Sequence, residues 1–258
     1  MKTDQDASRL TQFLRRRYNS TRKALRKYWA LKIFRLIFAI FALIPLIFVA
    51  KDPDSLTITD ADPRNTRDGY IVVNGSFRPI VANNSFEWSM LALARATAFA
   101  MYPDIFVIFF SKCRATIAFL SCTPVSMFLF RDMHDVHAYC GRFIALMVAE
   151  HTLLHLIRWG FAGNLSLVYK STAGITGLVV VYITPFITYI MMSDRMRKAI
   201  RFEIRKGLHY LFYVFSVTLC YHVPTTALPW GGYIRYVFAT TIIWYTLDTI
   251  YVNFFLTE

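Results

Sequence analysis

The sequence predicts an all-α membrane protein, a bundle of six transmembrane helices. Three observations predict this class: 56% of the 258 residues are hydrophobic, the mean hydropathy is +0.40, and the apolar residues form long stretches. Soluble domains have a smaller apolar share, broken by polar faces. A helix needs about 20 largely apolar residues to cross a bilayer. The stretches that qualify cover residues 29–50, 87–110, 136–157, 171–192, 208–223 and 232–255.

The segment before the first span, residues 1–28, is a basic arm that we expect on the cytosolic side. It is too long and too charged for a cleavable signal peptide, so the first span is expected to remain as an anchor. Leu10, Phe13 and Leu14 recur at helical spacing, which would let the arm lie on an anionic membrane surface. A solvated basic tail and an Arg-rich mitochondrial presequence are the alternatives.

The distribution of Lys and Arg predicts the orientation of the spans. The arm through Arg35, the second-to-third loop and residues 193–206 together carry 20 of these residues, whereas the opposite loops carry 7. Because basic residues are retained on the cytoplasmic side, both termini are expected in the cytoplasm. The sequons at Asn74, Asn83 and Asn164 lie in the opposite loops, in agreement with this orientation.

Two histidines on the third span predict a binding face. His137 and His151 are 14 residues apart, so on a helix they differ by about 40° in direction and by roughly 21 Å in height. They therefore share one face, at an inner and an outer depth. Ionisable or metal-binding residues inside a spanning helix are rare unless they have a function.

The fifth span carries a second pair, His209 and His222. These are 13 residues apart, which gives a rise of roughly 20 Å but a mismatch of about 140° on an ideal helix. The helix must depart from regular α geometry by one residue for both rings to face the same partner. We expect a π-bulge or local unwinding between Ser216 and Tyr221 to produce this departure.

The four histidines at matched depths predict two stacked b-type haems. Both helices run outward, so His137 is expected to pair with His209 and His151 with His222. Imidazole is a common axial ligand of haem iron, and two imidazoles leave no vacant position for a substrate on the iron. For any single histidine, a hydrogen bond to a neighbouring helix is an equal alternative.

Several stretches resemble the ferric reductase-like membrane domain that NADPH oxidases and metalloreductases share. They are His137-Ala-Tyr-Cys-Gly-Arg-Phe-Ile-Ala-Leu-Met-Val-Ala-Glu-His151-Thr-Leu-Leu-His155, then Phe202-Glu203 and His209-Tyr-Leu-Phe to His222. Three further stretches resemble the oxidases in particular: Leu91-Ala-Leu-Ala-Arg95-Ala, Cys113-Arg114 with Leu120, and Thr172-Ala-Gly-Ile-Thr-Gly. The resemblance covers roughly residues 86–258, within a domain expected over 29–258.

This resemblance implies a function in transmembrane electron transfer. It implies that Arg95 and His155 sit beside the outer haem as an oxygen-reducing pocket, with positive charge to stabilise superoxide as it forms. A salt bridge from Arg95 to Glu87, and an interhelical hydrogen bond for His155, are the plainer alternatives. Members of the oxidase family continue into FAD and NADPH domains, and this sequence has no Gly-x-Gly-x-x-Gly motif after a strand. A missing or separate cytosolic flavin dehydrogenase is therefore expected to supply electrons.

Three functions follow as expectations. The first is the haem-carrying half of a superoxide-producing NADPH oxidase, an enzyme in the plasma membrane with molecular oxygen and a flavin dehydrogenase as partners. The second is a metalloreductase that reduces extracellular ferric or cupric chelates. The third is a haem-binding membrane subunit without turnover. We expect the lipid bilayer as its surroundings and no nucleic-acid partner.

Overall fold

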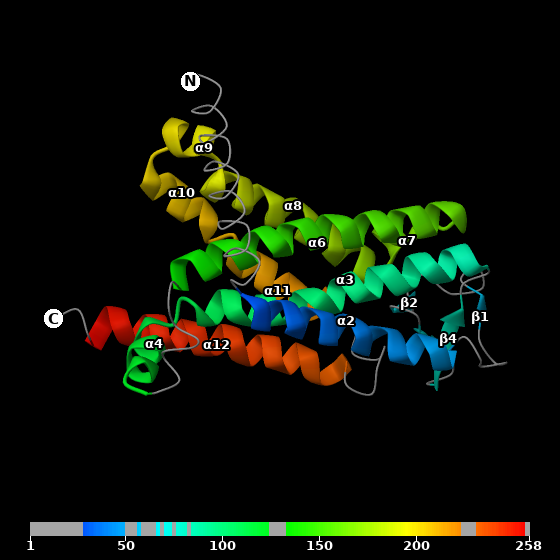
Figure 1. Ribbon diagram of the computed structural model, residues 1–258. Helices are drawn as coiled ribbons and strands as arrows, with labels where there is room; N and C mark the ends of the chain where they lie inside the picture. Colours follow the sequence, from blue (N-terminus) through cyan, green and yellow to red (C-terminus); the bar gives the residue numbers. More distant parts are fainter. Residues whose placement is uncertain are drawn as a thin grey trace, which may run out of the picture.

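The computed structural model describes residues 28–49, 56–57, 66–67, 70–73, 76–81, 84–123, 133–222 and 231–255, and most of these are helical (Figure 1). The basic arm over residues 1–27 lies outside the described residues. The helices are α2 (Trp29–Val49), α3 (Ser85–Phe110), α4 (Arg114–Ser121), α6 (Met133–Phe161), α7 (Leu167–Lys170), α8 (Thr172–Met192), α9 (Asp194–Ala199), α10 (Phe202–His209), α11 (Phe212–His222) and α12 (Gly231–Phe255).

Between α2 and α3 the chain forms four short strands: β1 (Leu56–Thr57), β2 (Thr66–Arg67), β3 (Tyr70–Val73) and β4 (Ser76–Val81). They are ordered β1-β4-β3-β2, with β1 parallel to β4 and the other neighbours antiparallel. These strands lie at one end of the long helices, and α4, α9 and α10 lie at the other (Figure 1).

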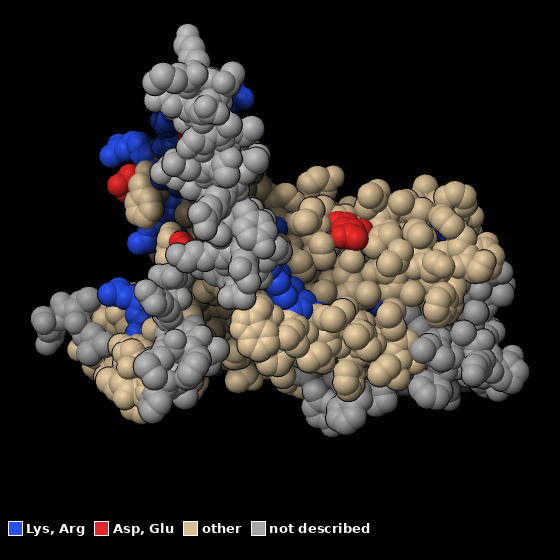
Figure 2. Space-filling model, viewed as in Figure 1, with Lys and Arg blue, Asp and Glu red and all other residues tan. Residues whose placement is uncertain are grey.

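Three of the described helices, α3, α6 and α8, are long and apolar enough to cross a membrane. Their outer surfaces carry large apolar side chains, for example Leu146 at 63% and Tyr182 at 73% exposure. A soluble monomer rarely exposes a continuous apolar surface of this extent. Figure 2 shows this face as largely uncharged along its length, with Lys and Arg gathered where α9 and α10 lie. The protein therefore has the character of a membrane protein.

Helix α3 lies between α2 and α6 and packs extensively on both. The core on its other side is closed by α8, α11 and α12, which contribute Val180, Phe215, Leu219 and Phe238. Burying such side chains stabilises the fold by about 1.5–3 kcal/mol each in water, but much less against lipid, so close packing and polar contacts gain weight here.

A buried ion pair joins α2 to α3. Arg35 Nε donates to Asp104 Oδ2 at 2.7 Å, a second bond joins Arg35 Nη2 to Asp104 Oδ1, and Arg35 Nη1 donates to the hydroxyl of Tyr139 on α6 at 2.7 Å. The guanidinium also lies 3.5 Å from the ring centre of Phe143. In the prediction of orientation, Arg35 is counted with the cytosolic arm. The structure instead places it inside α2 with a carboxylate partner, so it contributes no charge to that side.

The fifth apolar stretch is not one continuous helix. Helix α10 ends at His209, and α11 begins at Phe212. The backbone N–H groups of Tyr210 and Leu211 bond three residues back, to Gly207 and Leu208, as in a 3₁₀ turn. A distortion is thus present, but the prediction of its place between Ser216 and Tyr221 is wrong, since that segment is regular α-helix.

Candidate haem-binding site

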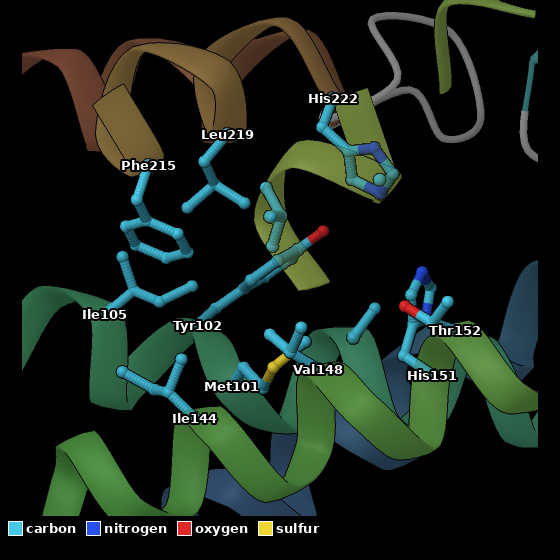
Figure 3. A pocket seen from close by; sticks show the side chains of 13 residues that line it. Met101, Tyr102, Ile105, Ile144, Val148, His151, Thr152, Phe215, Leu219 and His222 are labelled. Carbon is cyan, nitrogen blue, oxygen red and sulfur yellow. The ribbon is translucent and has the colours of Figure 1, made fainter. Parts of the chain in front are cut away.

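The two histidines expected at the outer depth lie opposite one another. His151 projects from α6, His222 is the last residue of α11, and their ring centroids are 6.0 Å apart. Figure 3 shows the two rings pointing toward each other across one end of a cavity. The outer pair therefore brings together residues 71 positions apart in the chain.

The inner histidines form a second pair of nearly the same geometry. His137, on the same helix as His151, and His209, the last residue of α10, have ring centroids 6.1 Å apart. The break after His209 places His209 and His222, the two histidines of the fifth apolar stretch, on separate helices, α10 and α11. Each helix can then present its ring to α6 despite the unfavourable 13-residue spacing.

Both histidines of α6 are oriented by carbonyl groups of α3. His151 Nδ1 lies 2.7 Å from the Ala94 oxygen, and His137 Nδ1 lies 3.0 Å from the Ile108 oxygen. A carbonyl only accepts, so these hydrogen bonds assign the ring proton to Nδ1 and leave the Nε2 lone pair available to a metal. The carbonyls are 14 residues apart, as the histidines are, because α3 and α6 pack antiparallel.

The same tautomer follows for His222. Its Nδ1 lies 3.0 Å from Thr176 Oγ1, and that hydroxyl donates its own proton to the Thr172 carbonyl at 2.6 Å. The hydroxyl must therefore accept from His222, which again leaves Nε2 unprotonated. In the fourth ring, His209, the buried Nδ1 has no hydrogen-bond partner among the described residues. Metal-bound histidines almost always donate their second nitrogen in this way, and three of the four do so here.

The spacing of each pair fits one metal ion between two imidazoles. A metal–imidazole bond is about 2.0 Å long and the ring nitrogen lies about 1.2 Å from the ring centre, so two rings on opposite sides of one ion have centres about 6.4 Å apart. The observed 6.0 and 6.1 Å agree. Among the described residues no cluster of three or more His, Cys, Asp or Glu is arranged to hold an ion. Each pair supplies two imidazoles, so a metal ion held there would need further ligands from outside the pair, as haem iron has in its porphyrin.

A largely apolar cavity lies between the two depths. It holds about 550 Å³, part of it open to the outside, and is lined by residues that include Met101, Tyr102, Phe215 and the outer histidine pair. A second space of about 400 Å³ is lined by the same pair together with His155 and residues of α8. The two spaces meet at His151 and His222.

The expected oxygen pocket falls on buried residues next to the outer pair. His155 stands one turn beyond His151 on α6, with ring centroids 4.7 Å apart, and is 6% exposed. Arg95 follows the carbonyl that orients His151 and is 4% exposed. The structure thus puts both residues at the depth of the outer pair.

The register of α3 and α6 bears on the alternative salt bridge between Arg95 and Glu87. In that register Glu87 lies level with Arg158 of α6, and both residues are buried. Arg158 is therefore a second cation, besides Arg95, at a depth where it could pair with Glu87. Arg158 is one of the seven Lys and Arg residues counted in the opposite loops, and the structure instead places it inside α6, where it is buried.

Further residues at the site were missed from the sequence. Thr176, which orients His222, appeared in the sequence analysis only within the motif Thr172-Ala-Gly-Ile-Thr-Gly. A single threonine on a neighbouring apolar helix does not by itself indicate that it will contact a ligand. Lys112 lies near both inner rings. The signal for the Arg35–Asp104 pair was present, because opposite charges inside two apolar stretches are rare without a partner.

In the loop after α3, outside the spans, the pKa values of Lys112 and Cys113 differ from their ordinary values. Burial lowers the pKa of Lys112, and burial together with Asp248 raises the pKa of Cys113 to about 12. Asp248 of α12 accepts hydrogen bonds from the backbone N–H groups of Ala115 and Thr116, at 3.2 and 2.8 Å, and so caps α4. This contact ties the loop to the end of α12.

In the comparisons with known proteins, no family model matches this chain, and no curated protein matches it.

Proposed function

We propose that this chain carries electrons across a membrane through two haems and delivers them to molecular oxygen on the outer side, as the haem-carrying half of a superoxide-producing oxidase. The observation that carries the proposal is the pair of equivalent imidazole sites, with centroids 6.1 and 6.0 Å apart. The rings of α6 differ in height by roughly 21 Å, a stack that reaches across much of the hydrocarbon layer.

When bound, each haem iron would take up and release one electron. The chain's own residues hold the rings in place: the carbonyls of Ala94 and Ile108 and the hydroxyl of Thr176 fix three of the imidazoles in the tautomer that coordinates through Nε2. Two imidazoles per iron would favour electron transfer over direct substrate binding. The inner pair would receive electrons from a cytosolic flavin dehydrogenase that uses FAD and NADPH.

The burial of the outer cluster supports oxygen over a metal chelate as the acceptor. Arg95 and His155 are 4% and 6% exposed, so a small neutral molecule reaches them more readily than a bulky ferric chelate. A guanidinium held in a low-dielectric site stabilises an anion that develops beside it. Arg95 would do this for superoxide, and His155 would help to exclude or orient water at the same place.

A haem count with histidine variants tests the first half of this proposal. Purified protein should show two low-spin haems per chain in a reduced-minus-oxidised spectrum. His137→Ala and His151→Ala should each lose one haem, whereas His134→Ala, an exposed histidine near the start of α6, should keep both. Protein that binds no haem after haem supplementation, or equal losses in the His134 variant, would exclude the proposal.

The acceptor is tested by reoxidation of the chemically reduced protein. Superoxide should appear when oxygen is added, and Arg95→Ala should slow this reoxidation at least about tenfold, because one removed donor to a developing anion typically costs more than that. Reoxidation by a ferric chelate should change much less. A slowing that is equal for both acceptors, or a chelate that outcompetes oxygen in the unmodified protein, would favour the metalloreductase.

A further inference from the structure

Lys112 occupies a fixed place beside the inner histidine pair. It follows Ser111, whose side chain lies 3.1 Å from His137 Nδ1 and bonds the Ile108 carbonyl at 2.9 Å. The backbone N–H of Lys112 donates to the Phe109 carbonyl at 3.0 Å, which holds the residue in the turn that ends α3. The same turn therefore orients the inner ligand and positions the lysine.

The Lys112 side chain is a half-buried cation within electrostatic reach of both His137 and His209. In the described part of the chain it makes no salt bridge and no side-chain hydrogen bond. Burial lowers its pKa, since the ammonium loses water without gaining a carboxylate partner. A lysine in this setting is stabilised by an anion that binds beside it.

We propose that Lys112 binds a propionate carboxylate of the haem at the inner pair and that its positive charge favours the reduced state of that haem. This inference rests on the proposed function. Haem carries two carboxylates at one edge, and the iron gains one negative charge on reduction, which a nearby cation stabilises. Along α3, Ala94 contacts the outer pair and Ile108 contacts the inner pair, and Lys112 follows Ile108 in the same direction. Lys112 would therefore also fix which edge of the inner haem faces the cytosolic end.

The charge itself is tested by redox titration of each haem. His137→Ala, which should keep only the outer haem, assigns the two midpoint potentials. Lys112→Gln should then shift the oxidation–reduction equilibrium of the inner haem about tenfold toward the oxidised state. This lowers its midpoint potential by about 59 mV for one electron, and the midpoint potential of the outer haem should not change. Lys112→Arg should keep the original value, and Lys206→Gln, the same charge change at an exposed position of α10, should have little effect.

The identity of the anion is tested with haem whose propionates are esterified. If Lys112 binds a propionate, the ester should lower the affinity of the unmodified protein for the inner haem, and this difference should shrink in Lys112→Gln. A phosphate from a lipid headgroup would give equal differences in both proteins and would overturn the assignment.

Unchanged potentials in Lys112→Gln, or loss of the inner haem from both Lys112→Gln and Lys112→Arg, would overturn it too. Loss from Lys112→Gln alone would support it, and an unmodified protein without haem would instead defeat the proposed function.

Discussion

Replacing Gly177 by alanine would press a methyl group against His222. A Cβ at this position of α8 would lie 3.3 Å from His222 Cε1 and 3.8 Å from its Nδ1. Ordinary carbon–carbon contacts are about 3.5–4.0 Å, so the ring would have to move by about 0.2–0.7 Å. Metal–ligand distances tolerate only about 0.2 Å. The substitution should therefore displace the outer imidazole from its place opposite His151.

The expected result is selective weakening of the outer haem. Residues that orient a metal ligand typically contribute 10- to 100-fold to metal affinity, so Gly177→Ala should lower the affinity for the outer haem by about that factor. The measurement is a spectroscopic haem titration of the apoprotein, with His137→Ala as the background so that only the outer haem binds. The inner haem, measured in a His151→Ala background, should bind as before.

Gly207→Ala is the matched control. No atom lies within 4 Å of a Cβ at Gly207, which is inside α10. The same substitution there should leave haem binding intact and stabilise the helix by up to about 1 kcal/mol. If Gly177→Ala binds the outer haem as tightly as Gly207→Ala does, the inferred contact with the outer ligand does not govern binding, and the geometric argument fails.

Other perturbations test the same structure. Asp104→Leu should lower the free energy of unfolding by about 3–5 kcal/mol because it leaves Arg35 buried without its carboxylate; adding Arg35→Met should restore part of that loss in detergent-unfolding measurements, and strictly additive losses would show that the pair is not coupled. Thr176→Val should weaken the outer haem about tenfold, whereas Thr176→Ser should not, as judged by haem titration; equal behaviour of the two would exclude the hydrogen bond as the cause. A thiol reagent at pH 7–8 should modify the exposed Cys122 and spare Cys113, whose pKa is raised to about 12 by burial; mass spectrometry showing equal modification would contradict that burial.

Much of the helical content followed from the apolar pattern. The stretch 29–50 became α2, Trp29–Val49, and 232–255 became α12, Gly231–Phe255. Such runs are long, and a buried backbone in an apolar setting must satisfy its own hydrogen bonds, which leaves helix as the local solution. That all six stretches cross a bilayer remains a prediction for three of them.

In the fifth stretch, the sequence predicted a distortion but not its position. Helical arithmetic required a distortion between His209 and His222, and one is present, but at Tyr210 and Leu211 rather than after Ser216. A 3₁₀ turn and a π-bulge both change the phase of a helix. Which peptide gives way depends on packing partners such as Phe109, whose ring lies 5.9 Å from that of Phe212 just after the break.

The sequence alone determined the depth of each candidate ligand, because depth follows from position along an apolar helix of known rise. The tertiary structure decided direction: which ring meets which, which carbonyl holds its proton, and that Asp104 faces Arg35 across 69 residues of sequence. Direction around a helix is set by side-chain packing and by breaks in the backbone ladder, and these depend on neighbours that are distant in the chain.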